Sequence, residues 1–159
     1  GFIMEYKSQR LYRDARIFSI YEGTTQLQVV AAIRYITNGT YLSIIDEMLG
    51  EAVAEDLKPL QERVKKLVEL YRQAVDYVKE TGCQEAQDFL ARRLYEMTAE
   101  ILMSLLILND ATRAPQLFTK SANVYVRMAE ADVVAHYTYI KSFIAEDLVN
   151  FRAQAQTAE

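Results

Sequence analysis

Apolar residues recur every three to four positions along most of the chain, a spacing that predicts α-helices. The clearest case lies between Pro59 and Gly82, where apolar positions alternate four and three apart and form one continuous seam. The seam residues are Leu60, Val64, Leu67, Tyr71, Ala74 and Val78. No pair of alternating strands and no internal repeat interrupts this pattern. We therefore predict an all-α fold, an antiparallel helical bundle with long helices.

Prolines and glycines are few, and they divide the pattern into six expected helices. Thr24 fits an N-cap, because its hydroxyl can accept from a backbone N–H two or three residues on. Asn38-Gly39 fits a helix end, an interpretation we favour over the glycosylation sequon that Asn38-Gly39-Thr40 also matches. Residues 101–108 are apolar on nearly every face and are expected to be buried. The expected helices span about 4–16, 24–37, 41–54, 59–81, 84–109 and 115–151.

Composition is that of a folded domain and argues against several kinds of site. The 159 residues are 51% hydrophobic and carry a net charge of -4, which does not suggest a nucleic-acid partner. Cys83 and His136 are the single cysteine and histidine, so a Cys/His zinc site cannot be assembled. No long window is free of charge, so no transmembrane segment is predicted. The expected location is cytoplasmic, with the mitochondrial matrix as the alternative.

His136 lies on an apolar stripe with Val133, Ile140 and Phe143. A lone histidine in that setting is more often hydrogen-bonded and half buried than a metal ligand. The di-iron signature of helical bundles needs Glu-x-x-His pairs, whereas Val133 stands three residues before His136. We therefore predict no metal site.

Glu22 stands between Tyr21 and Gly23, in a stretch predicted to connect two helices. A glycine beside it allows close approach of a ligand or of backbone, which suits a carboxylate acting as a general base with a raised pKa. An ordinary turn residue fits the same pattern, and on composition alone it is the better interpretation. The residues by themselves leave both alternatives open.

The segments around Glu22 resemble a known family. "Arg-Leu-Tyr-Arg-Asp-Ala-Arg-Ile" at 10–17 and "Ile-Tyr-Glu-Gly-Thr-Thr-Gln-Leu-Gln" at 20–28 are similar, in order and spacing, to the C-terminal signature of the flavin-dependent acyl-CoA dehydrogenases. The resemblance covers about the first 37 residues. It implies that Glu22 is the base that removes the proton alpha to the thioester carbonyl while a hydride leaves the beta carbon for the flavin.

Other residues of the motif acquire expected roles from the same resemblance. Tyr21 and Gly23 would contact substrate, Gly23 by leaving room for the thioester. Thr24 and Gln26 would contact FAD at the start of the second helix, where a helix N-terminus favours electron-rich groups. The backbone N–H of Glu22 would help to polarise the thioester oxygen. Placing the base here slightly disfavours the long-chain and isovaleryl subfamilies.

The resemblance also sets the expected organisation. We expect residues 1–40 to be the C-terminal catalytic segment of the dehydrogenase helical domain and 41–159 to be a helical-bundle extension packed with it. The chain lacks the family's N-terminal and middle domains, so we expect a fragment that is inactive alone and does not retain FAD. Implied partners are an acyl-CoA substrate, electron-transfer flavoprotein and further copies of the chain, since the helices at 4–16 and 24–37 need a surface to lie on. The alternatives are a non-catalytic oligomerisation module and an acyl-CoA oxidase relative.

Overall fold

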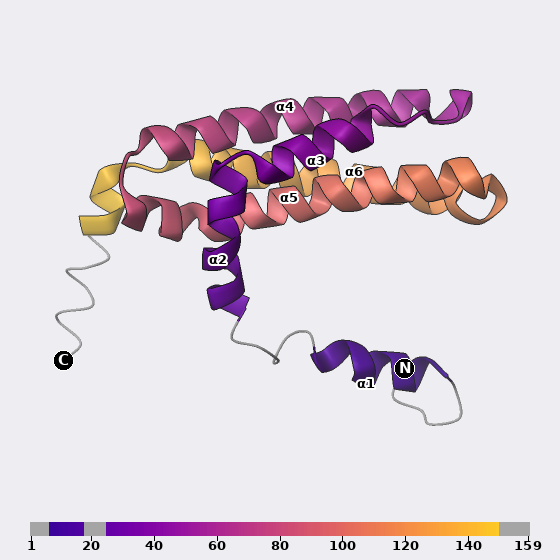
Figure 1. Cartoon of the computed structure of the whole chain (residues 1–159), viewed down its shortest axis with the longest axis horizontal. Coiled ribbons are helices and arrows are strands. Elements are labelled where there is room, and N and C mark those ends of the chain that lie inside the picture. Colours follow the sequence, from indigo (N-terminus) through magenta and orange to yellow (C-terminus); the bar gives the residue numbers. More distant parts are fainter. Residues whose placement is uncertain (1–6, 18–24, 150–159) are drawn as a thin grey trace.

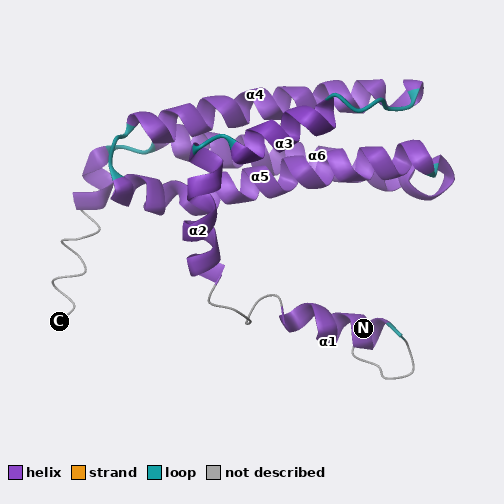
Figure 2. Cartoon of the chain, in the orientation of Figure 1, coloured by secondary structure: helices purple, strands orange, loops and turns teal. Residues whose placement is uncertain are grey.

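The computed structural model describes residues 7–17 and 25–149, together with every side chain in these ranges except that of Gln26. Within these ranges all regular secondary structure is helical, so the all-α prediction is confirmed for them (Figure 2). The elements are α1 (Ser8–Arg16), α2 (Thr25–Thr37), α3 (Thr40–Leu49), the short 3-10 helix η2 (Glu55–Leu57), α4 (Lys58–Glu80), α5 (Gln84–Arg113) and α6 (Pro115–Ser142).

Helices α4, α5 and α6 lie side by side and form the bundle (Figure 1). Pro59 stands in the first turn of α4, where a missing N–H costs nothing, and Gly82 follows the helix with a left-handed φ of 59°. Each residue of the predicted seam is buried, from Leu60 at 6% exposed to Val78 at 0%. The seam predicted from the spacing of apolar residues is therefore the side of α4 that faces α5 and α6.

Helix α2 joins this bundle from the side. Val29, Ile33 and Ile36 are at most 2% exposed and belong to the same apolar core as α4, α5 and α6, with α2 packing chiefly on α5. Figure 1 shows α2 crossing the long axis of α5, with its first turn projecting beyond the bundle. Gly39 ends the helix with φ 90°, which a residue with a side chain rarely adopts. The predicted helix end at Asn38-Gly39 is confirmed.

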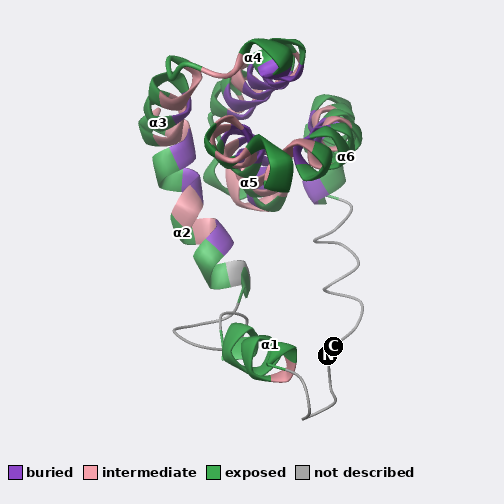
Figure 3. Cartoon of the chain, turned by 90° about the vertical axis from the view of Figure 1, so that its right-hand side faces the viewer, coloured by how far each residue is buried: buried purple, intermediate pink, exposed green. Residues whose placement is uncertain are grey.

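Helix α1 is different, because none of its residues is buried. It lies apart from the bundle, and its surface is almost entirely exposed (Figure 3). Of the two N-terminal helices, which were expected to lie on the bundle or on the same surface of a second copy, α2 packs on the bundle of its own chain, whereas for α1 the contact with a second copy stays a prediction.

Two helices end earlier than the sequence pattern indicates. The helix expected at 41–54 stops at Leu49, after which Ala54 turns extended and donates its N–H to Thr112 Oγ1 at 3.3 Å. The helix expected to reach residue 151 is interrupted after Ser142, because Phe143 adopts an extended conformation and buries its ring against Phe89, 5.7 Å away between ring centres. Residues 145–149 are helical again. In both cases contact with another helix outweighs continued helical hydrogen bonding.

The segment 101–108 of α5 is only partly buried, which corrects the prediction that all of it faces the interior. Ile101, Leu105 and Leu108 are buried, whereas Met103 is 49% and Leu106 is 48% exposed. The reason is that the helices packed on α5 cover only part of its circumference, so a segment that is apolar on nearly every face cannot be buried on every face. The same helix continues past the expected Asn109 to Arg113.

Candidate functional site

The residues that the sequence predicts to touch substrate and cofactor lie almost entirely outside the described ranges. This holds for Tyr21, Glu22, Gly23 and Thr24. Gln26 lies in the first turn of α2, but its side chain is outside the described part. What the structure does show is the helix that follows the predicted base and how that helix is held.

One side of α2 is fixed to the bundle and the other is open. Val29 and Ile33 are buried against the bundle, whereas Leu27 is 63% and Tyr35 is 54% exposed. A helix that is apolar on both sides is typical of one enclosed between two partners. The described residues supply one such partner, the bundle, on the side of Val29 and Ile33.

The start of α2 suits an electron-rich group. Its first turn contains no acidic residue. The first backbone N–H groups of a helix have no partner within the helix, and the helix dipole places partial positive charge there. The flavin contact expected of Thr24 and Gln26 stays a prediction, because Thr24 and the Gln26 side chain lie outside the described part.

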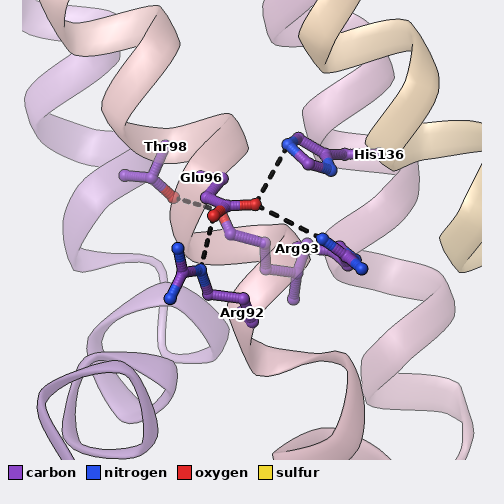
Figure 4. Close-up of polar contacts among 6 residues, drawn as sticks. Arg92, Arg93, Glu96, Thr98 and His136 are labelled. Carbon is purple, nitrogen blue, oxygen red and sulfur yellow. Dashed lines mark hydrogen bonds and ion pairs between the residues drawn. The ribbon is translucent and has the colours of Figure 1, made fainter. Parts of the chain in front are cut away.

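A cluster of charged side chains joins α5 to α6 around Glu96 (Figure 4). Glu96 Oε2 lies 3.1 Å from His136 Nε2 and 3.6 Å from an Arg93 terminal nitrogen, and Arg92 Nε donates to Glu96 Oε1. The Arg93 guanidinium also lies over the ring of Tyr139, 4.8 Å from its centre. The side chains of Glu96 and His136 are 26% and 19% exposed.

This arrangement favours a structural role over an acid–base one. The Glu96 carboxylate faces three nitrogen donors, so its lone pairs are largely used and it is a poor acceptor for a substrate proton. His136 is half buried, as the sequence predicts, and its Nε2 lies beside the Glu96 carboxylate. Glu96 is not among the residues predicted from the sequence, although the Arg92–Glu96 spacing of four along a helix is a usable signal.

A second ion pair connects α4 to α6. Arg63 Nε donates to Glu130 Oε1 at 2.8 Å, and a terminal nitrogen of Arg63 binds the other carboxylate oxygen. The Arg63 hydrogen bond holds the pKa of Glu130 below its ordinary value, against the opposing effect of burial. The two-point geometry sets the rotation of α4 against α6 as well as their separation.

The core contains one buried polar pair of note, Tyr71 and Thr98. Thr98 Oγ1 lies 2.8 Å from both the Leu94 carbonyl oxygen and Tyr71 Oη. A carbonyl only accepts and Thr98 has one hydroxyl hydrogen, so Thr98 donates to Leu94 and accepts from Tyr71. Burial raises the pKa of Tyr71 to about 12. The pair links α4 to α5 in the centre of the bundle.

A shallow groove of about 350 Å³ runs between α5 and α6, lined by Ile107, Lys120, Ser121, Val124, Tyr125 and Met128. Val124 and Met128 are 62% and 56% exposed.

In residues 7–17 and 25–149 no group of three or more His, Cys, Asp or Glu side chains has the arrangement of a metal site. Among the helices described there, none is both long enough and apolar enough to cross a membrane.

Comparison with known proteins shows which family the bundle belongs to. Residues 37–148 match the family described as "Acyl-CoA dehydrogenase C terminal". The crystal structure of the acyl-CoA dehydrogenase family protein from Porphyromonas gingivalis is similar, with a TM-score of 0.68 and 35% identity, covering 72% of this chain and 98% of that one.

Two curated relatives match over a short stretch of 28 residues. The caffeyl-CoA reductase-Etf complex subunit CarC of Acetobacterium woodii is 64% identical, and the 3-(aryl)acrylate reductase of Clostridium sporogenes is 57% identical. The stretch is 18% of this chain and 7% of each relative. The chain therefore matches only a small part of the length of these two proteins.

Proposed function

The chain belongs to the acyl-CoA dehydrogenase family, and we propose that it is the C-terminal part of an FAD-dependent enzyme that removes hydrogens from the alpha and beta carbons of an acyl-CoA thioester. In this proposal Glu22 is the base that takes the alpha proton. Tyr21 and Gly23 border the thioester, and Thr24 and Gln26 contact the flavin. FAD, when bound, would accept the hydride from the beta carbon.

The observation that carries the proposal is the anchoring of α2. The motif that resembles the dehydrogenase signature ends within this helix, and Val29, Ile33 and Ile36 tie the same helix to the core of the bundle. A base removing a weakly acidic proton must be held in a narrow geometry. The bundle would supply a rigid support at Val29 to Ile36, seven to fourteen residues after Glu22, which gives the C-terminal extension a role in catalysis.

The chemistry required of Glu22 follows from general acid–base principles. A proton alpha to a thioester is a poor acid, so the base must become stronger when substrate arrives. Exclusion of water from a carboxylate raises its pKa in that direction. The backbone N–H of Glu22 would stabilise the negative charge that develops on the thioester oxygen.

The test is Glu22→Gln in the full-length protein that contains this chain. An amide cannot accept the proton, so we expect retained flavin and acyl-CoA binding and a loss of flavin reduction of at least about 10³-fold. Glu47→Gln is the matched control, because Glu47 is an exposed glutamate on α3. Near-normal flavin reduction by the Glu22 variant would place the base elsewhere.

The names of the two curated relatives bear on direction and partner. Both are called reductases, and one is named as a subunit of an Etf complex. For this chain we propose electron-transfer flavoprotein as the redox partner and a cytoplasmic location. An anaerobic assay with acyl-CoA, and separately with the corresponding enoyl-CoA and reduced flavoprotein, would show which direction the enzyme favours. Rapid reoxidation of reduced flavin by oxygen alone would instead indicate an oxidase.

A second candidate function is assembly, favoured by the exposed apolar side chains on α5 and α6. Met103, Leu106, Val124 and Met128 are each about half exposed or more. Val124 and Met128 line one groove between α5 and α6, and an exposed apolar groove is a candidate contact surface between copies. If copies of the chain pair here, Met128→Glu should lower the mass measured by light scattering, whereas Lys141→Glu at the far end of α6 should not. A parent that is monomeric in the same measurement would rule this assembly out.

A further inference from the structure

At the junction between α2 and α3, the side chain of Asn38 accepts two hydrogen bonds from Thr40. Asn38 Oδ1 accepts a hydrogen bond from Thr40 Oγ1 at 2.7 Å and another from the Thr40 backbone N–H at 3.0 Å. Asn38 and Thr40 are both exposed. Gly39 lies between them with φ 90°, and a side chain added to it would meet nothing within 4 Å.

We propose that Asn38 is a site of spontaneous covalent modification, in which the Gly39 backbone nitrogen attacks the Asn38 side-chain amide. The Gly39 nitrogen loses its proton to solvent base and bonds to Asn38 Cγ, and the Cγ–Nδ2 bond breaks as ammonia leaves. Water then opens the five-membered succinimide at either carbonyl, giving aspartate or isoaspartate at position 38. No oxidant or reductant takes part, and the reactants are the chain, water and a base.

The two hydrogen bonds from Thr40 favour the attack. Negative charge develops on Asn38 Oδ1 when the nitrogen adds to Cγ, and donors already placed on that oxygen stabilise it. Gly39 has no side chain, so no Cβ stands beside the attacking nitrogen.

One contact opposes the reaction. The Gly39 N–H donates to the Ile36 carbonyl oxygen, which disfavours loss of its proton, but at 3.3 Å this bond is long. The contacts at Oδ1 are shorter and number two. The two hydrogen bonds at Asn38 Oδ1, which favour the attack, outweigh the one long hydrogen bond at the Gly39 N–H, which opposes it. We therefore expect the reaction to occur in the folded chain.

The change would affect the part of the molecule that holds α2. Either product places a negative charge at the C-terminal end of α2, where the helix dipole is already negative. Isoaspartate also routes the backbone through the side chain, which adds a carbon between α2 and α3. The same charge lies beside the first N–H of α3, where it is favourable, so the longer isoaspartyl backbone is the change that loosens the junction holding Ile36 and Ile45 in the common core.

The experiment follows the purified chain during incubation at mildly alkaline pH, with peptide mass spectrometry and isoaspartyl methyltransferase labelling as the two readouts. We expect conversion at Asn38 and none at Asn109 or Asn123 over the same period. Asn109 and Asn123 lie within helices, are followed by Asp110 and Val124, and use their Nδ2 groups as donors to Glu51 and Thr119. An unmodified Asn38, after a period in which the urea-unfolded chain has converted, would overturn the proposal.

Thr40→Val removes the hydroxyl donor while keeping the side-chain shape. Loss of one neutral hydrogen bond corresponds to a slowing of about two- to tenfold. Thr37→Val is the matched control, because the Thr37 hydroxyl donates to Ile33 at the same helix end without touching Asn38. In urea the parent and both variants should convert at equal rates. Equal rates for parent and Thr40→Val in the folded state would contradict the assigned role of Thr40.

Discussion

If the bundle holds the helix that follows Glu22, then Ile33→Ala should release that helix. Ile33 is 2% exposed and lies in the middle of the buried side of α2. The substitution removes three carbons, worth about 0.8 kcal/mol each in lost burial, and the cavity raises the cost to about 2–5 kcal/mol. Since α2 packs on the side of the bundle, this cost should appear first as local opening of α2.

Hydrogen exchange measured by mass spectrometry separates local from global effects. Amides of α2 should exchange at least about thirtyfold faster, the ratio that 2 kcal/mol represents. Amides in the centre of α4 should stay close to the parent. Leu27→Ala is the control on the same helix, because Leu27 is 63% exposed, and its effect should stay within about 0.5 kcal/mol. Unchanged α2 exchange in Ile33→Ala, or an equal effect from Leu27→Ala, would refute the anchoring.

Three further predictions concern the bundle itself. Leu67→Asp should abolish the cooperative thermal transition seen by circular dichroism, because Leu67 is 2% exposed, whereas Lys66→Asp on the exposed side should leave the transition in place. The pKa of Tyr71 is raised to about 12, so folded stability should fall as pH rises from about 10 towards 12. Tyr71→Phe should lose less over that range in urea titrations. The pKa of Glu130 is lowered by Arg63, so its contribution should be present above pH ~4.3 and fall away in more acidic solution, and Glu130→Gln should flatten that acid dependence.

Sequence reasoning was most successful where apolar spacing alone determines structure. The seam of α4 and the ends of this helix at Pro59 and Gly82 follow from periodicity and backbone chemistry, and the structure confirms them. The half-buried position of His136 also follows from the sequence, because this residue stands on an apolar stripe. These features depend on residues close together in the sequence.

The errors all depend on contacts between distant segments. Whether Met103 is buried depends on which helices surround α5, and the local pattern contains no information about that. The end of α6 depends on Tyr77, whose hydroxyl donates to the Phe143 carbonyl oxygen at 2.8 Å from 66 residues away in sequence. The proposed site at Glu22 falls into neither group, because it rests on resemblance and lies outside the described residues.

The division predicted at residue 40 separates the catalytic motif from the extension, but the core crosses that division. Val29, Ile33 and Ile36 come from the first part and belong to one cluster with Ile45, which follows the boundary, and with residues of α4, α5 and α6. The family match begins at residue 37, so it leaves almost all of α2 outside while its partners lie inside. Helix α2 therefore belongs to both parts, since the catalytic motif ends in its first turns and its buried side belongs to the bundle. A chain ending near residue 40 would expose these three side chains to water, and the helix that follows Glu22 would lose the support that the bundle provides.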